Sequence, residues 1–155
     1  MIKMLVMDVD GTLTDGKIYM GNDGEIMKAF SAHDAVGVRK LRKHDIIPII
    51  ITGRESSIVT NRALEMEMHD DYIFQNISNK LVKLNELMQK YSLDYHEIAY
   101  IGDDENDLEC MKVCGIRGCP SDAMDIIKRE CNFISKYKAG DGAVREFVEY
   151  VIENN

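Results

Sequence analysis

Two carboxylates separated by one residue follow a short apolar run near the start of the sequence. Asp8 and Asp10 lie in the segment DVDGT, directly after the run MLVM. A divalent cation would relieve the repulsion between such carboxylates, and Mg²⁺ prefers carboxylate, water and phosphate oxygens. In a phosphoryl-transfer site Asp8 would attack phosphorus, while Asp10 would protonate the leaving oxygen and later activate water. Taken alone, the motif is equally typical of an acidic turn.

Two further polar side chains stand where apolar runs end or helices begin. Thr52 follows the run IIPIII, and its hydroxyl and neighbouring N–H groups suit a phosphate oxygen at a helix N-terminus. Lys80 begins a helix-length segment, and its ammonium could neutralise charge on a transferring phosphoryl group. Taken singly, Thr52 is more typical of a helix N-cap and Lys80 of a solvated surface charge.

An acidic cluster follows a third apolar run, residues 98–101. The segment GDDEND places four acidic side chains within five residues, which is costly unless a cation or hydrogen-bond donors compensate. We expect Asp103 to ligate the metal, and Asp104 and Asp107 to orient water, Lys80 or the loop. A capped helix start is the alternative interpretation. Three apolar runs thus each end in a group that one phosphoryl-transfer site needs, and their combination predicts such a site.

The elements that must position these residues alternate between strand-like apolar runs and helix-length amphipathic segments. This alternation predicts an α/β fold with a Rossmann-like parallel sheet and helices on both faces. Such sheets bind ligands outside the carboxyl ends of their strands. The predicted strands are 4–7, 46–51, 71–74, 98–101, 115–119 and 133–134. The predicted helices are 34–43, 56–66, 80–91, 106–113, 123–129 and 142–152.

One segment interrupts this alternation. Residues 17–20 and 25–30 flank the sequence GNDG, which is typical of a β-hairpin turn. We expect this hairpin, about residues 17–30, to project over the site as a flap. The 155 residues are expected to form one domain, 1–155, and no stretch is long enough to be a cap domain.

The composition excludes several classes of function. A net charge of −8 argues against nonspecific nucleic-acid binding, which needs a basic surface. No apolar run approaches the ~20 residues of a membrane span, and no secretory signal is recognisable, so we expect a soluble, cytoplasmic protein. The four cysteines lack the tight pairs or nearby histidines of a zinc site and are expected to be reduced thiols.

The order of the motifs resembles the haloacid dehalogenase superfamily. That order is D-x-D-G-T, then T-G-R, then Lys80, then G-D-D-x-x-D. Within the superfamily the chain is similar to the small capless phosphatases of 3-deoxy-D-manno-octulosonate 8-phosphate. The hairpin and the segments 30–39, 75–81 and 140–146 carry this similarity, which covers nearly the whole chain.

The resemblance implies a set of roles for individual residues. Mg²⁺ would be bound by the side chains of Asp8 and Asp103 and by the backbone carbonyl of Asp10, while Thr52 and Lys80 would hold the phosphate. Besides Asp10 and Lys80, the implied substrate contacts are Ser31, Ala32, His33, Asp34 and Ala35, with Arg39, Arg54 and Arg62 as cationic contacts. Arginine suits the carboxylate of a sugar acid phosphate, which is the implied small-molecule partner. The resemblance also implies a homotetramer in which the hairpins associate and the Gly-rich segment near the C-terminus reaches a neighbouring site.

The identity of the sugar acid stays open at this point. The sequence has His33-Asp34-Ala35 where Arg-Asp-Gly is expected in the octulosonate enzymes, and Ser57 where relatives often carry a charge. Close relatives act on nine-carbon, sialic-acid-type 9-phosphates, which are the alternative substrates along with a broader set of phosphomonoesters. A catalytically silent, metal-binding assembly domain is an alternative of another class. Its signature would be a lost nucleophile, whereas Asp8 is present.

Overall fold

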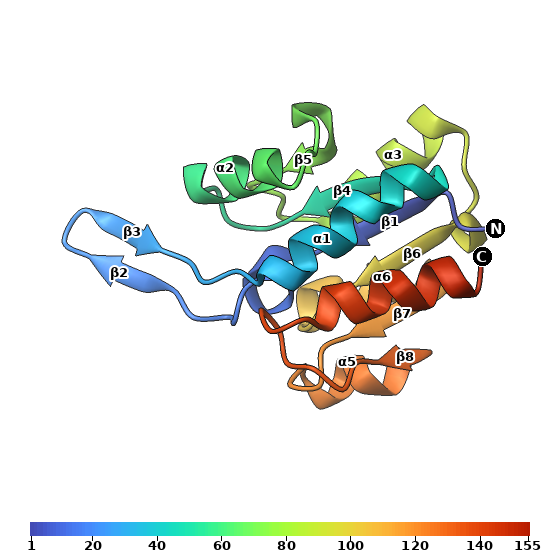
Figure 1. The fold of residues 1–155 in the computed structure, drawn as a ribbon. Coiled ribbons are helices and arrows are strands. Elements are labelled where there is room, and N and C mark those ends of the chain that lie inside the picture. Colours follow the sequence, from blue (N-terminus) through green and yellow to red (C-terminus); the bar gives the residue numbers. More distant parts are fainter.

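A parallel sheet of six strands runs through the centre of the computed structural model, which describes residues 1–155 (Figure 1). The strands lie in the order β5-β4-β1-β6-β7-β8. The central strand β1 pairs with both β4 and β6, so that Val6 lies between Ile49 and Tyr100. The strand bounds are β1 Met4–Met7, β4 Ile47–Ile51, β5 Ile73–Phe74, β6 Ile98–Ile101, β7 Ile116–Cys119 and β8 Phe133–Ile134.

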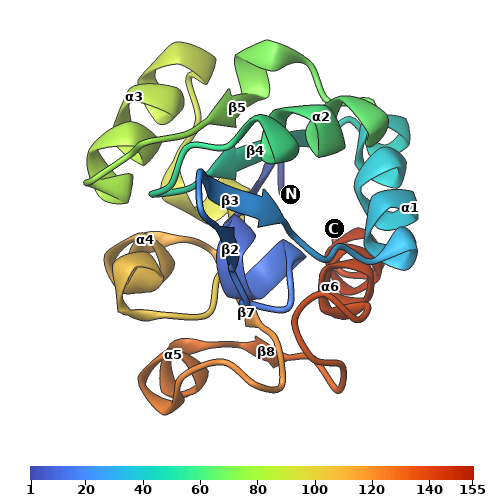
Figure 2. The ribbon, with the colours of Figure 1, turned by 90° about the vertical axis from the view of Figure 1, so that its left-hand side faces the viewer.

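Helices cover both faces of this sheet, as Figure 2 shows. Alternate side chains of β1 enter the two cores, Leu5 and Met7 on one face and Met4 and Val6 on the other. The first face is covered by α1 (Ala32–Leu41), α2 (Ser57–Glu65) and α6 (Ala143–Glu153); the second by α3 (Lys80–Tyr91), α4 (Leu108–Val113) and α5 (Asp125–Glu130). The predicted fold class is confirmed.

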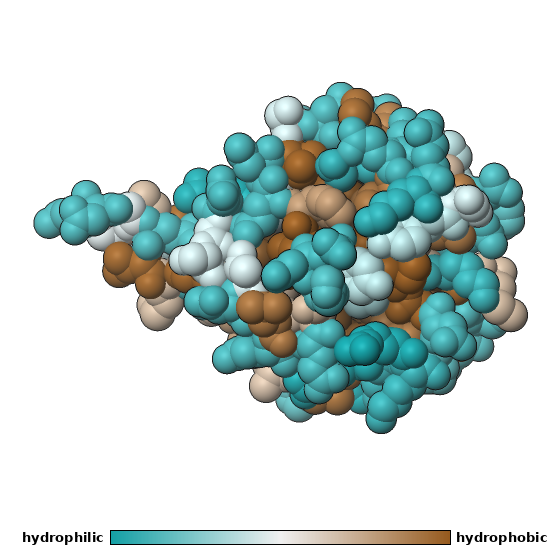
Figure 3. Space-filling model, turned by 90° about the horizontal axis from the view of Figure 1, so that it is seen from above, coloured by the Kyte–Doolittle hydropathy of each residue, from teal (hydrophilic) through white to brown (hydrophobic).

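A hairpin of two antiparallel strands, β2 (Tyr19–Gly21) and β3 (Gly24–Met27), projects from the body (Figures 1 and 3). Its turn contains only Asn22 and Asp23, so each strand reaches one residue further toward the turn than predicted, while at their outer ends β2 begins later than 17 and β3 ends earlier than 30. An isolated bridge between Thr14 and Phe30 joins the two chain segments at its base. The structure contains no separate cap domain.

Local capping explains where the observed helices and strands depart from the predicted bounds. Helix α1 begins at Ala32 rather than at residue 34, because the Ser31 hydroxyl accepts hydrogen bonds from the backbone N–H groups of His33 and Asp34. Residues 70–72 form a single helical turn instead of the start of a strand. A similar turn at 105–107 precedes α4, which was predicted to begin at 106. The other bounds differ by two residues or fewer, apart from those of the hairpin.

The cysteines form no disulfide. Cys110, Cys114 and Cys119 are buried in the core between the sheet and α3, α4 and α5, and Cys131 is half-buried. None of the helices in the structure has both the length and the apolar character required to cross a membrane.

Candidate active site

The carboxyl ends of three adjacent strands bring the predicted phosphoryl-transfer residues together. Asp8 directly follows β1, Thr52 directly follows β4, and Asp103 follows β6 after one glycine. Because β1 lies between β4 and β6, these residues meet at one edge of the sheet. They border a cavity of about 360 Å³ that no hydrophobic side chain lines. The lining residues are Asp8, Asp10, Thr52, Gly53, Arg54, Asp103, Asp104, Glu105 and Asn106.

The glycine of the first motif makes room for the carboxylate of Asp103. Gly11 lies in the wide turn Val9–Leu13 with a φ of +86°, a conformation that favours glycine. A Cβ atom at this position would lie 2.1 Å from the Asp103 Oδ2 atom. The Thr12 hydroxyl donates a hydrogen bond to Asp103 Oδ1 at 3.3 Å. The turn after β1 is therefore shaped around the acidic residue that follows β6.

Lys80 forms a buried ionic network at the floor of the site. Its Nζ donates hydrogen bonds to Asp8 Oδ1 and Asp107 Oδ1, both at 2.7 Å. All three side chains are at most 5% exposed, so each charge depends on its partners. Burial lowers the pKa of Lys80, but the charges of Asp8 and Asp107 outweigh this effect and raise the pKa above its usual value. Lys80 therefore carries a positive charge beside the predicted nucleophile.

Each carboxylate oxygen of Asp107 accepts two hydrogen bonds. Its Oδ1 accepts from the Tyr100 hydroxyl at 2.7 Å as well as from Lys80. Its Oδ2 accepts from the backbone N–H groups of Asp103 at 3.1 Å and Asp104 at 3.4 Å. Although Asp107 lies close enough to Asp8 and Asp103 to join a metal site, these contacts favour a role in holding Lys80 and the loop. The Asp104 side chain accepts from the backbone N–H of Glu105.

The oxygens of the buried Asp8 and the half-buried Asp103 remain as the pair that could hold a cation. Burial and the charge of Asp107 raise the pKa of Asp8 to about 6, although Lys80 lowers it. Burial and the charges of Asp8 and Asp107 raise the pKa of Asp103 to about 8. The charge of Asp8 thus destabilises the charged form of Asp103, and Asp107 does the same to both. A divalent cation between them would remove this cost, and an all-oxygen donor set fits Mg²⁺.

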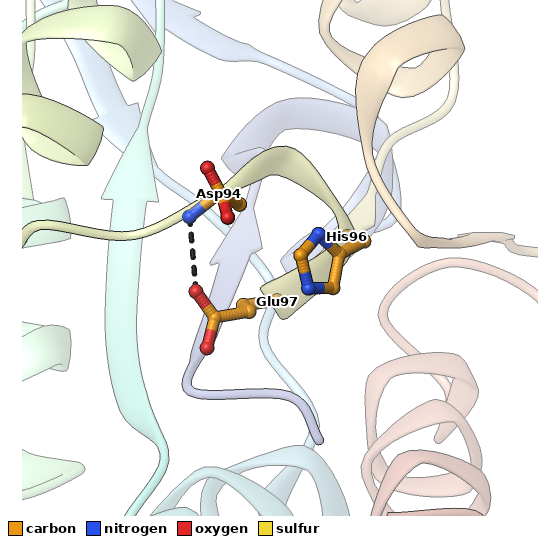
Figure 4. A group of neighbouring side chains, drawn as sticks. All are labelled: Asp94, His96 and Glu97. Carbon is orange, nitrogen blue, oxygen red and sulfur yellow. Dashed lines mark hydrogen bonds between the residues drawn. The ribbon is translucent and has the colours of Figure 1, made fainter.

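A second group of possible metal ligands lies at the opposite edge of the sheet. Asp94, His96 and Glu97 belong to the single turn that precedes β6, and their candidate ligand atoms lie within 4.8 Å of one another. Figure 4 shows the hydrogen bond from the Asp94 backbone N–H to Glu97 Oε2, which is 3.0 Å long. Asp94 and His96 are exposed and Glu97 is half-buried. The Glu97 carboxylate therefore caps a turn, and solvent screens the remaining charges.

Of the predicted substrate-binding arginines, only Arg54 lines the active-site cavity. Its guanidinium lies 3.4 Å from Glu25 Oε2. Arg62 donates to the Ser31 carbonyl at 3.1 Å, and Arg39 donates to the Glu65 carbonyl at 3.3 Å. Both of these arginines thus contact the ends of helices α1 and α2 in this structure.

The segment 31–35 serves mainly to cap helices. Ser31 caps α1, and Asp34 Oδ1 accepts from the backbone N–H of Arg145 at 2.8 Å in the first turn of α6. Burial raises the pKa of Asp34 to about 6. The remaining members of the segment line no part of the 360 Å³ cavity: Ala32 lines a separate cavity of about 450 Å³ with Arg62, His33 is exposed, and Ala35 is in the core. Their roles as substrate contacts stay predictions.

Sequence reasoning missed three residues that surround the site. The Lys28 ammonium contacts the Asp10 carboxylate and Glu25, and the Tyr100 hydroxyl contacts Asp107. Tyr100 lies in the run IAYI, where an aromatic residue is ordinarily part of the core. Glu25 and Lys28 belong to the hairpin segment, and their spacing of three residues, which would place them on opposite faces of a regular strand, gave no sign that both contact the body.

Comparisons with known proteins agree with this geometry. A family model described as haloacid dehalogenase-like hydrolase matches residues 70–147. The chain is 37% identical over 151 residues to the 3-deoxy-D-manno-octulosonate 8-phosphate phosphatase KdsC of Yersinia pestis, covering 97% of this chain and 80% of that protein. It is 36% identical to KdsC of Escherichia coli strain K12, covering 97% of this chain and 79% of that protein.

Solved structures give the same assignment. The crystal structure of the Yersinia pestis phosphatase superposes with a TM-score of 0.93 at 37% identity, covering 98% of this chain and 81% of that chain. The phosphatase of Moraxella catarrhalis, solved with magnesium ion, phosphate ion and KDO, superposes with a TM-score of 0.92 at 36% identity, covering 98% and 86%. The chain belongs to the haloacid dehalogenase-like hydrolases. Within them, it is a member of the 3-deoxy-D-manno-octulosonate 8-phosphate phosphatase family.

Proposed function

We propose that this chain is a Mg²⁺-dependent phosphatase that hydrolyses 3-deoxy-D-manno-octulosonate 8-phosphate through an aspartyl-phosphate intermediate. The observation that carries the proposal is the buried contact of 2.7 Å between Lys80 and Asp8, beside Asp103, in a member of this family. A carboxylate held by a buried cation next to a second carboxylate is suited to attack on a bound phosphoryl group.

Each residue of the site has a defined part in the proposed reaction. An Asp8 oxygen forms a bond to phosphorus as the bond from phosphorus to the sugar oxygen breaks, and Asp10 gives its proton to that oxygen. In the second half, Asp10 takes a proton from water, which attacks phosphorus and releases Asp8 and inorganic phosphate. Thr52 and Lys80 hold the phosphoryl oxygens. When bound by Asp8, Asp103 and the Asp10 carbonyl, Mg²⁺ supplies positive charge to this centre.

The substrate assignment is supported by both the relatives and the charge at the cavity. The curated relatives are named for the octulosonate phosphate, and the Moraxella catarrhalis phosphatase was solved with KDO. Arg54 at the mouth of the cavity offers a forked donor to the carboxylate of a sugar acid. The other predicted contacts, including Arg39 and Arg62, would reach the sugar only if the substrate extends beyond the cavity or a second subunit contributes to the site.

We further propose that the chain assembles as a cytoplasmic homotetramer through its hairpins. The hairpin exposes Met20 at 62%, Ile26 at 65% and Met27 at 50%, and its projection places these side chains away from the core of the subunit (Figure 3). Exposed apolar side chains gathered in this way are typical of an interface. The free cysteines fit a reducing compartment. Light scattering should give a mass near four times that of the chain, and Met20→Asp with Ile26→Asp should reduce it.

The test of the function is phosphate release from matched substrates. The eight-carbon octulosonate 8-phosphate, a nine-carbon sialic-acid-type 9-phosphate and a neutral sugar phosphate would be compared with Mg²⁺ and with EDTA. We expect EDTA-sensitive release that is fastest with the eight-carbon acid and absent in Asp8→Asn. Preference for the nine-carbon acid would change the substrate but keep the chemistry. No release from any ester would favour a silent metal-binding domain.

A further inference from the structure

Lys28 is a buried cation that the reaction outlined above does not use. It directly follows β3, at the point where the hairpin returns to the body of the protein. Its side chain is 0% exposed, and its Nζ contacts Asp10 Oδ1 and Glu25 Oε2. Lysine is rarely buried to this extent unless it is paired, because removing an ammonium from water is costly. The position of Lys28 is therefore determined by its two carboxylate partners.

Glu25 anchors Lys28 from the hairpin side. Its Oε2 lies 3.0 Å from Lys28 Nζ and 3.4 Å from the Arg54 guanidinium. Its Oε1 accepts a hydrogen bond of 2.6 Å from the hydroxyl of Ser56, which caps α2. Burial raises the pKa of Glu25, but the hydrogen bonds from Ser56 and Lys28 outweigh this and leave it below its usual value. The hairpin is thereby joined through charged contacts to the segment that follows β4.

The backbone fixes the same geometry around Asp10. Asp10 lies in the turn Val9–Leu13, and Thr14, directly after that turn, forms a bridge with Phe30, two residues after Lys28. The backbone therefore joins the turn to the end of the hairpin. Lys28 occupies Asp10 Oδ1, while Asp10 Oδ2 receives no hydrogen bond from the protein. The Asp10 side chain is 21% exposed and borders the cavity.

This arrangement suits a carboxyl group that must transfer a proton in a fixed direction. When Asp10 gives the proton on Oδ2 to the leaving oxygen, the bond from phosphorus to that oxygen breaks and a negative charge remains on the carboxylate. The Lys28 ammonium, already bonded to Oδ1, stabilises that charge without any rearrangement. It also restricts rotation of the carboxylate, so Oδ2 stays free to exchange a proton with the leaving oxygen or with water.

We propose that Lys28 is a positioning residue for Asp10. Its ammonium holds the carboxylate of the general acid through Oδ1, and the hairpin places Lys28 beside Asp10. This inference rests on the proposed phosphatase function. It makes the hairpin part of the catalytic apparatus of its own subunit, in addition to any role in assembly.

The loss of kcat/KM on replacing Lys28 should therefore depend on the leaving group. Protonation matters most when the departing oxygen is a poor leaving group, and it matters little for an acidic phenol. A residue that supports the general acid should therefore be needed for an alkyl or unsubstituted phenyl ester and be nearly dispensable for a p-nitrophenyl ester. A residue that only stabilises the fold, or only binds phosphate, would affect all these esters equally.

The experiment compares kcat/KM across a series of substituted phenyl phosphates for the wild-type protein, Lys28→Met and Lys28→Arg. We expect Lys28→Met to lower kcat/KM by about 10-fold or more for phenyl phosphate and by less than about 3-fold for p-nitrophenyl phosphate, so that the plot against leaving-group basicity becomes steeper. Lys28→Arg keeps a cationic donor and should restore most of the loss. Lys112→Met, which removes an exposed lysine paired with Glu109, is the matched control and should leave the plot unchanged.

Each other outcome has a definite meaning. An equal loss across the series, or no loss at all, would overturn the positioning role of Lys28. A rise in KM confined to the sugar acid phosphate would place Lys28 on the substrate and would also overturn it. If Lys28→Met does not fold, Glu25→Gln, which removes the charge that anchors Lys28, provides the comparison, and a plot with the same slope as that of the wild-type protein would refute the inference. Absence of phosphatase activity in the wild-type protein would instead refute the proposed function, on which the inference rests.

Discussion

Strand β6 has an acidic cluster at each of its ends. The ligand atoms are similarly close together in the two clusters, but the clusters differ in burial and in their partners. Asp103 and Asp107 follow the carboxyl end of β6 and meet Asp8, whereas Asp94 and Glu97 precede its amino end beside His96. In both groups the candidate ligand atoms lie within 4.8 Å of one another. The first group is largely buried and contains the Lys80 ammonium, while the second lies mostly in solvent and contains a capping interaction.

The difference shows that proximity of carboxylates does not by itself make a site. Burial removes the solvent that would screen the charges, so Asp107 raises the cost of ionising Asp8, and Asp8 and Asp107 raise the cost of ionising Asp103. A cation, whether Lys80 or a metal ion, then becomes necessary for the charged form. At the amino end of β6, water screens the acidic groups, and no cation is required. The contrast predicts large effects of substitution at one end and small effects at the other.

The largest effect should come from Asp8→Asn. Replacing the carboxylate by an uncharged amide leaves a far weaker nucleophile, and we expect kcat to fall by about 10⁴-fold or more with the octulosonate phosphate. The measurement is phosphate release at saturating Mg²⁺, with circular dichroism to show that the variant is folded. Retention of Mg²⁺-dependent activity in this variant would remove Asp8 from the nucleophile role.

Lys80→Met should reduce both activity and stability. Loss of the ammonium leaves Asp8 and Asp107 buried without their shared partner, which is expected to cost about 3–5 kcal/mol of unfolding free energy. Activity should fall by about 10²-fold or more, because charge on the phosphoryl group is no longer compensated. Urea unfolding and phosphate release would measure the two effects.

Lys83→Met, on the same helix, is the matched control for Lys80→Met. Lys83 pairs with Glu86 on the surface, and its loss should change the free energy of unfolding by about 1 kcal/mol or less. If the two lysine variants were equally stable, the Lys80 network would not hold the floor of the site together.

The stabilisation of the folded protein by Mg²⁺ should depend on pH, because the metal would bind at the buried carboxyl-end cluster of β6. In the unfolded chain Asp8 and Asp103 lose their protons near pH 3.8, whereas burial raises the folded-state pKa values to about 6 and about 8. Folding therefore takes up protons, and the metal-free protein should lose stability as pH rises from about 4 to about 8. Mg²⁺ binds the deprotonated carboxylates, so its stabilising effect should grow over the same range.

Thermal melts with Mg²⁺ and with EDTA at pH 6 and pH 8 would measure this effect. At about 100 times the Kd, Mg²⁺ adds about 2.7 kcal/mol, which corresponds to a rise in Tm of about 5–10 °C. The rise should be greater at pH 8 than at pH 6 and should be lost in Asp103→Asn. A pH-independent rise that persists in Asp103→Asn would place the metal elsewhere.

The carboxyl-end cluster could be predicted from the sequence because its position follows from the strands. Asp8, Thr52 and Asp103 each come after a continuous apolar run, and parallel strands that alternate with helices present their carboxyl ends at one edge. The fold class and strand positions depend on the same local pattern. Motif order then supplied the family resemblance.

What the sequence did not predict depends on contacts between residues distant along the chain. Asp34 caps α6 through a hydrogen bond to a residue 111 positions later, and nothing within its own helix indicates this. Lys28 reaches Asp10 only because the hairpin bends back toward the turn after β1. Neither a hydrophobic period nor a short motif contains that information, since it arises from the packing of separate elements.

The smallest effect should come from the amino end of β6. Asp94→Asn with Glu97→Gln removes both carboxylates but keeps amide oxygens that can accept the hydrogen bond of the capping interaction. Because the group is largely solvated, we expect the free energy of unfolding to change by about 1 kcal/mol or less and the Mg²⁺-induced rise in Tm to equal that of the wild-type protein. Isothermal titration with Mg²⁺ would count the sites directly. A loss of one bound ion in this double variant would show that the exposed cluster holds a metal despite its solvation, and burial would then no longer explain why the two ends of β6 differ.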